Sequence, residues 1–145
     1  MKRCCPRIVP KPLTAVLLAF VVVAGCGKGS PEKYLKIGQD HLNKGKTKEA
    51  LKAYSQAIDA DSKCKKAYIG RAICYADLGQ DKKAIADYTK AIELDPSGDA
   101  YPYDQRSILY RRAKQNDKAE ADKAKAEVIR DGRWEELGNE KNRRR

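Results

Sequence analysis

From residue 31 onward, apolar residues recur three and four positions apart, which is the spacing of one face of an α-helix. The pattern is interrupted near Gly45, Asp61, Gly79 and Asp95, so it predicts a succession of helices. The whole arrangement also repeats after 34 residues. The residues that coincide after this shift are Tyr34 and Tyr68, Gly45 and Gly79, Lys48 and Lys82, Ala50 and Ala84, Tyr54 and Tyr88, Ala57 and Ala91, Ile58 and Ile92, and Asp61 and Asp95.

A repeat of this length is one helical hairpin that cannot bury its own apolar face, so its copies must stack into a solenoid. We expect repeats at 31–64, 65–98 and 99–131. The third is degenerate: after a one-residue insertion near Gly98, Lys114 stands at the turn-glycine position and Lys123 at an aromatic position. A polar last layer of this kind is typical of the end of a solenoid, whose surface usually binds a partner.

Small residues recur where two helices must approach closely, and tyrosines recur where they would fill the space between helices. Gly38 and Ala72 occupy such a position in the first helix of their repeats, and Ala50 and Ala84 in the second. These residues resemble the tetratricopeptide repeat. The resemblance implies an all-α helix-turn-helix solenoid of about three repeats. A short capping helix in residues 132–145, containing Trp134 and Leu137, would cover its end.

Four positions carry finer structural expectations. Arg71 occupies an apolar position, where we expect its stem to lie along the packed face with its charge in water. Ser62 stands where the repeat family has proline. Thr47 and Asp81 are predicted to cap the second helices of the first two repeats, because their side-chain oxygens can accept from free backbone N–H groups.

The N-terminus has a different composition from the repeats. A basic start precedes an apolar run from Leu13 to Val23, which is the pattern of a secretory signal and is too short for a typical membrane span. Val23-Ala24-Gly25-Cys26 resembles the lipobox of bacterial lipoproteins. It predicts cleavage of residues 1–25, lipidation of Cys26, a tether at 26–30 and a periplasm-facing location. No acidic residue follows Cys26, which favours the outer membrane in a Gram-negative host.

The 145 residues carry a net charge of +11, and 35% are charged, a composition of solvated helices around a thin core. Cys4 and Cys5 leave with the signal. If the segment from Lys65 is helical, Cys64 and Cys74 lie about 15 Å apart along its axis, too far for a disulfide. Cys74 is therefore expected to be a small core residue.

No residue pattern supports catalysis, a metal site or a cofactor. His41 is the only histidine and stands where the second repeat has Tyr75, so we expect it to be packed. Acidic residues fall beside lysines at helical spacing, as on a solvated surface. The spacing of the tyrosines explains them as core residues, which argues against base stacking and a nucleic-acid partner.

A second apolar set lies on the first helices of the repeats, rotated away from the tyrosines. Together with neighbouring polar residues, it predicts a groove for an extended segment or helix of another protein. The alternative, that these residues pack against neighbouring helices, stays open. The predicted groove residues are Leu35, Gln39, Leu42, Ile69, Ile73, Asp77, Ile108, Arg111 and Arg112, with Asn43, Lys66, Tyr101 and Asp104 around them.

These features predict a lipid-anchored adaptor or assembly scaffold whose partner is an envelope protein or peptide segment. Three repeats are near the minimum for a stable stack, so a homodimer is a further expectation. Two other hypotheses are a pilotin-like factor for secretin or pilus assembly and a binder of anionic cell-wall polymer. Family members that clamp a C-terminal carboxylate have Lys or Asn where Leu35, Gln39 and Gly70 stand, so a chaperone-tail clamp is not expected. The basic tail, Lys141 and Arg143 to Arg145, either contacts anionic lipid or serves solubility.

Overall fold

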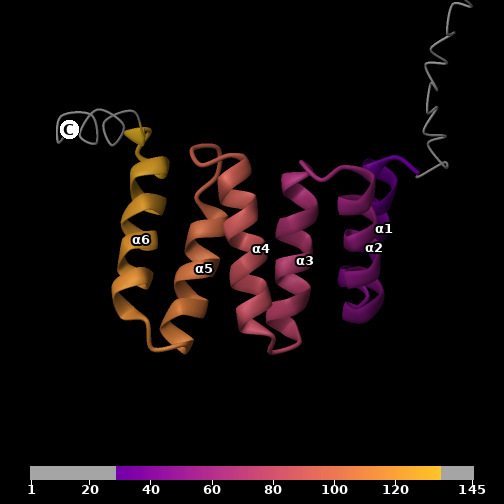
Figure 1. Ribbon diagram of the computed structural model, residues 1–145, viewed down its shortest axis with the longest axis horizontal. Coiled ribbons are helices and arrows are strands. Elements are labelled where there is room, and N and C mark those ends of the chain that lie inside the picture. Colours follow the sequence, from indigo (N-terminus) through magenta and orange to yellow (C-terminus); the bar gives the residue numbers. More distant parts are fainter. Residues whose placement is uncertain (1–28, 135–145) are drawn as a thin grey trace, which may run out of the picture.

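The computed structural model describes residues 29–134, which form α-helices joined by short turns. The helices are α1 (Pro31–Asn43), α2 (Thr47–Ala60), α3 (Lys65–Asp77), α4 (Asp81–Leu94), α5 (Tyr101–Arg112) and α6 (Asn116–Arg130). They follow one another along the long axis as three hairpins (Figure 1). The turns within hairpins lie at one edge, and the links between hairpins lie at the opposite edge. The all-α solenoid predicted from the repeat is therefore confirmed.

The helix ends explain the regular spacing. Ser30 caps α1, its side-chain oxygen accepting from the Lys33 N–H at 3.4 Å, and Pro31 follows it. Gly45 and Gly79 end the first helices of two hairpins with φ of 69° and 70°, a conformation that glycine adopts without steric cost. The next N–H reaches back to the helix at each turn, as from Lys46 to the His41 carbonyl at 2.9 Å.

The predicted caps at the second helices are wrong by one residue. Thr47 and Asp81 are the first residues of α2 and α4, so they belong to the first helical turn and do not occupy the N-cap position. Lys46 and Gln80 hold the cap positions without a side-chain hydrogen bond. The N-cap residues Lys46 and Gln80 directly follow the turn glycines. Their backbone N–H groups bond back to His41 and Tyr75 of the preceding helices, so the end of one helix fixes where the next begins.

The core is thin and built from alanine and tyrosine. Tyr54, Tyr88 and Tyr103 are at most 3% exposed, and each belongs to a separate buried cluster along the stack. The ring of Tyr54 lies against the backbone of both Gly38 and Gly70, where a Cβ would collide with it. The predicted role of small residues is thus confirmed at the first junction.

The third hairpin ends the described part of the stack. Ala119 and Ala126 of α6 are fully buried, whereas Lys123 is exposed as expected for a last layer. After Gly132, Trp134 folds back so that its ring centroid lies 6.4 Å from that of Tyr103. The predicted signal segment, Cys26 and most of the tether lie outside the described residues, as does the capping segment from residue 135.

No helix within residues 29–134 is long and apolar enough to cross a membrane.

Candidate functional site

The first feature of the site is a hollow of about 410 Å³ between the first and second hairpins. Leu35 and Gln39 reach it from α1, and Ile69 and Ile73 from α3, with the Tyr54 ring at the base. Most of the lining is apolar, because α1 and α3 turn their partly buried aliphatic residues toward each other here. A space of this size holds one or two side chains of a ligand.

A second hollow of about 150 Å³ continues from the first across Ile73, which lines both. It lies between α3 and α5 and is bordered by Asp77, Tyr101, Ile108 and Arg112. Tyr101 and Ile108 are 40% and 39% exposed. They lie two helical turns apart on α5, so they present one apolar strip. We call the two joined hollows the groove.

Two tyrosines belong both to the buried core and to the lining of the groove. Tyr88 lines the second hollow while almost fully buried, and burial, followed by the neighbouring Tyr101 with its hydrogen bond, raises the pKa of Tyr88. Burial likewise raises the pKa of Tyr54 to about 12. Both phenols are therefore neutral at physiological pH and offer hydroxyl groups rather than charge at the base of the groove.

The charges along the groove are unevenly distributed. Lys36 and Lys66 border the first hollow and no carboxylate lines it. The second hollow has Asp77 and Arg112, and the Arg112 guanidinium lies 3.6 Å from Asp81. A ligand with an apolar side chain in the first hollow would therefore meet two ammonium groups beside it, which favours an adjacent acidic group.

Most of the predicted groove residues are brought together, but two line neither hollow. Leu42 packs against the cluster around Ala50, Tyr54 and Cys74. Arg111 lies exposed at the end of α5. Asp104, expected near the groove, instead accepts hydrogen bonds from Arg130 of α6 at 2.8 and 3.0 Å.

The charge of Arg71 does not lie in water as expected. Its guanidinium donates two parallel hydrogen bonds to Asp87 of α4, at 2.7 and 2.8 Å. The Arg71 side chain is 22% exposed and that of Asp87 only 9%, so the charge is compensated within the hairpin rather than by water. The hydrogen bond to Asp87 is the main reason why the pKa of Arg71 is raised. The expectation was wrong because it considered Arg71 without a partner.

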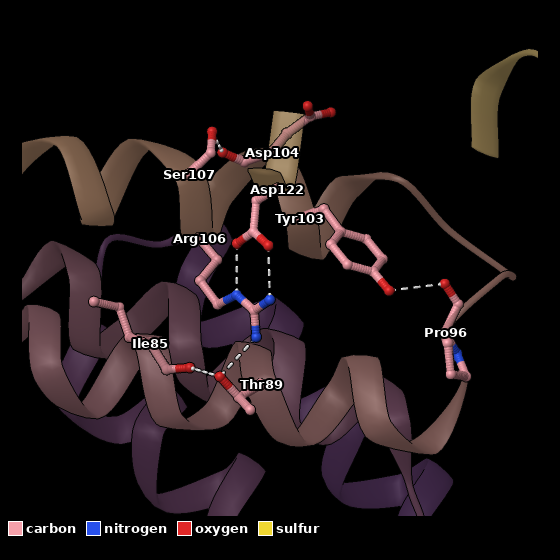
Figure 2. A network of polar contacts seen from close by, with 8 residues as sticks. All are labelled: Ile85, Thr89, Pro96, Tyr103, Asp104, Arg106, Ser107 and Asp122. Carbon is pink, nitrogen blue, oxygen red and sulfur yellow. Dashed lines mark hydrogen bonds and ion pairs between the residues drawn. The ribbon is translucent and has the colours of Figure 1, made fainter. Parts of the chain in front are cut away.

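The third hairpin repeats this pair in a more buried form. Arg106 donates to both oxygens of Asp122 at 2.7 and 2.8 Å, and its third nitrogen donates to the Thr89 hydroxyl at 2.8 Å (Figure 2). Burial lowers the pKa of Arg106, but the hydrogen bond and charge of Asp122 outweigh it and raise the pKa overall. Thr89 belongs to α4, so the pair also joins the third hairpin to the second.

Sequence reasoning missed three of these four residues. Arg and Asp are 16 positions apart in both pairs, and the second pair follows the first by 35 residues. This recurrence was the available signal. The first repeat carries Ile37 and Ala53 at the matching positions, so the apolar pattern that defines the repeat hides the substitution.

Among the described residues, no group of three or more His, Cys, Asp or Glu side chains could hold a metal ion. His41 is half-buried, and its Nδ1 is buried without a hydrogen-bond partner. Cys74 is fully buried, as expected, and burial raises its pKa to about 11. Cys64 and Cys74 are both free.

Comparison with known proteins agrees with the hairpin architecture. The family model described as the tetratricopeptide repeat matches residues 35–99. The crystal structure of MamA superimposes with a TM-score of 0.69 over 72% of this chain and 61% of that chain, at 24% sequence identity. This chain has a tetratricopeptide-repeat fold.

Two repeat structures in complex with partners are also similar. The second repeat domain of Spaghetti (RPAP3) bound to the HSP90 peptide SRMEEVD has a TM-score of 0.67, 22% identity, and coverage of 71% of this chain and 94% of that chain. The TPR2B domain of yeast Sti1 in complex with pHsp70 has a TM-score of 0.65 at 27% identity, covering 68% and 78%.

Two curated relatives match the repeats in sequence. The Bos taurus protein named DnaJ homolog subfamily C member 3 is 34% identical over 100 residues, which is 68% of this chain and 20% of the relative. Hsp70-Hsp90 organizing protein 1 of Glycine max is 42% identical over 60 residues, 41% of this chain and 10% of the relative. This chain thus spans a fifth or less of these two relatives.

Proposed function

We propose that this protein is an adaptor that holds a segment of a partner protein in the groove. The observation that supports this most is the continuity of the two hollows through Ile73, with Ile108 and Tyr101 exposed along it. Similar repeat structures, one bound to an HSP90 peptide and one in complex with pHsp70, also support the proposal.

The charge distribution defines the kind of segment. An apolar anchor would enter the first hollow over Tyr54, and acidic groups beside it would meet Lys36 and Lys66. A second apolar side chain would lie against Ile108 and Tyr101. The proposed ligand is therefore an extended or helical segment with two apolar anchors and acidic neighbours.

The groove is tested by crosslinking in intact cells. A photo-reactive amino acid placed at Gln39 or at Ile108 of the full chain should capture a discrete partner, identified by mass spectrometry. The same photo-reactive amino acid at Lys52, an exposed position on α2, is the position control. Capture of the same proteins from Lys52 would contradict the proposal.

The variants must leave the fold intact. Ile69 and Ile73 also pack against the core, so their substitution confuses folding with binding. Lys36→Glu with Lys66→Glu changes two exposed residues and should abolish capture, while Lys52→Glu with Lys90→Glu makes the same change of charge elsewhere and should not. Equal loss in both pairs would refute recognition by the groove.

We further propose that the adaptor works in the bacterial envelope, anchored through a lipid on Cys26 and facing the periplasm. The support is the sequence around Cys26 and the basic and apolar segments before it. Metabolic labelling with an alkyne fatty acid should mark the wild-type chain and not Cys26→Ser. Labelling of both would exclude this anchor.

A further inference from the structure

The turns within the three hairpins form one edge of the solenoid (Figure 1). We call residues 43–49, 77–83 and 111–118 the turn edge. They contain nine Lys or Arg and four Asp or Glu. The opposite edge, comprising residues 30–33, 59–66, 93–99 and 127–133, contains six basic and eight acidic residues. Positive charge is therefore concentrated at one edge rather than spread over the domain.

Two lysines of this edge are held in place by the hairpins. The Lys83 ammonium lies 5.4 Å from the Tyr75 ring centroid, and the Lys118 ammonium lies 5.5 Å from that of Tyr110. The two contacts occupy matching positions 35 residues apart. Cation–π contacts of this kind restrict otherwise mobile side chains, so each turn presents an oriented charge.

Lys114 provides an independent observation. It adopts φ of 58° at the position where Gly45 and Gly79 stand in the other hairpins. The turn is otherwise the same, with the next N–H bonding back to Tyr110 at 2.9 Å. A non-glycine residue is strained in this conformation, and such strain is concentrated at functional positions. A lysine here adds charge to the edge at a cost in stability.

We infer that the turn edge is a second binding surface, which adjoins the groove at Asp77 and Arg112 and extends away from it, for a linear polymer of phosphate groups. The three turns lie in a row at one edge (Figure 1), and they contain three, two and four basic residues against one, two and one acidic residues. A row of lysines and arginines with an excess of positive charge at its two ends matches an extended polyanion. Shallow hollows at the second and third turns, lined by residues 79–83 and 114–118, each have two lysines and one aspartate in their lining.

Two other anionic partners fit the edge less well. Among the described residues, only Leu78 is a large apolar side chain exposed at this edge, so there is little to insert into a bilayer. Tyr75 and Tyr110 are half-buried under lysines and offer no free ring for stacking on bases. A polymer recognised by charge alone requires neither.

The test uses the full chain in detergent and inorganic polyphosphate of about 45 phosphates, with triphosphate as the short probe. Because binding across three turns is multivalent, the long chain should bind at least ten-fold more tightly than triphosphate. The affinity should fall steeply with salt, as counterion release requires. Equal affinity for the two probes would overturn the proposal.

Matched variants locate the site. Lys46→Gln, Lys82→Gln and Lys118→Gln remove three charges from the turn edge. As the control, Lys33→Gln and Lys63→Gln remove two charges from the opposite edge, and Lys125→Gln removes a third from α6 just before that edge. Lys118 and Lys125 each lie over a tyrosine ring, at 5.5 and 5.9 Å. The first set should weaken binding about ten-fold or more and lower the salt slope by about 3. Equal effects of both sets would refute a defined edge.

The two surfaces can be separated. Lys36→Glu with Lys66→Glu should lose partner capture but keep polyphosphate binding within about three-fold, since each phosphate contact acts locally. Loss of polyphosphate binding in this variant would place the polymer in the groove and overturn the proposal. Anionic vesicles or single-stranded DNA binding more tightly than polyphosphate at equal charge would assign the edge to those partners instead.

Discussion

The buried pair of Arg106 and Asp122 gives the sharpest stability prediction. The two side chains are 10% and 4% exposed, and Asp122 accepts two hydrogen bonds from the guanidinium. Asp122→Ala leaves a buried arginine without a counter-charge, a change that costs about 3–5 kcal/mol. A domain of this size has a free energy of unfolding of about 5–15 kcal/mol, so the loss should be a large fraction of it.

The first repeat supplies the matching control. It has Ile37 and Ala53 where the third repeat has Arg106 and Asp122. Arg106→Ile with Asp122→Ala therefore installs a combination that this chain already packs. Because it removes both charges, the double variant should regain most of the stability lost by the single one and come within about 1 kcal/mol of wild type.

Urea unfolding followed by circular dichroism at 222 nm measures these differences, provided that the dependence on urea stays constant between variants. The exposed pair of Lys90 and Glu93, 48% and 58% exposed, serves as comparison, and Glu93→Ala should cost at most about 0.5 kcal/mol. The reasoning fails if Asp122→Ala costs under about 1 kcal/mol. It also fails if the double variant is as unstable as Asp122→Ala, because a cavity rather than an unpaired charge would then be responsible.

Three further predictions concern the turn and the buried thiol. Lys114→Gly relieves a φ of 58° and should stabilise the domain by about 1 kcal/mol, seen as a higher melting temperature, whereas Gly79→Lys should lower it. Cys74, whose pKa burial raises to about 11, should resist a thiol reagent at pH 9 while half-buried Cys64 reacts; mass spectrometry of native protein distinguishes them. Because a raised pKa favours the protonated folded form, the contribution of Cys74 should be complete below pH 9 and be lost between about pH 9 and 11. Equal labelling of both thiols would contradict its burial.

The sequence allowed the architecture to be predicted because each repeat position has a simple steric requirement. Gly38 and Gly70 must lack a Cβ beside the Tyr54 ring, and the turn glycines must adopt positive φ. The turn glycines recur after 34 residues, so a comparison at this period finds them. Gly38 is matched by Ala72 and is found only as a small residue, and Gly70 has no small counterpart at Lys36.

The candidate site was predictable only in part. Ile69 and Ile73 were recognisable as a second apolar set, but Leu42 follows the same pattern and lines neither hollow. Helical periodicity gives the direction of a side chain and not the distance to its neighbour. The ion pairs were missed for a related reason. A charged residue at the Arg71 or Asp87 position is explained only by the opposite charge on the facing helix, and helical periodicity considers one position at a time.

The uneven distribution of these pairs also affects how the chain finds its native arrangement. Near-identical hairpins can in principle exchange helices during folding, since their alanine and tyrosine faces are interchangeable. If α1 packed on α4 or α6, Ile37 would face Asp87 or Asp122 and leave a carboxylate dehydrated without a cation. If α3 or α5 packed on α2, an arginine would face Ala53. The first hairpin can therefore close only on itself, and this selectivity gives a repetitive chain a fixed starting point for assembly.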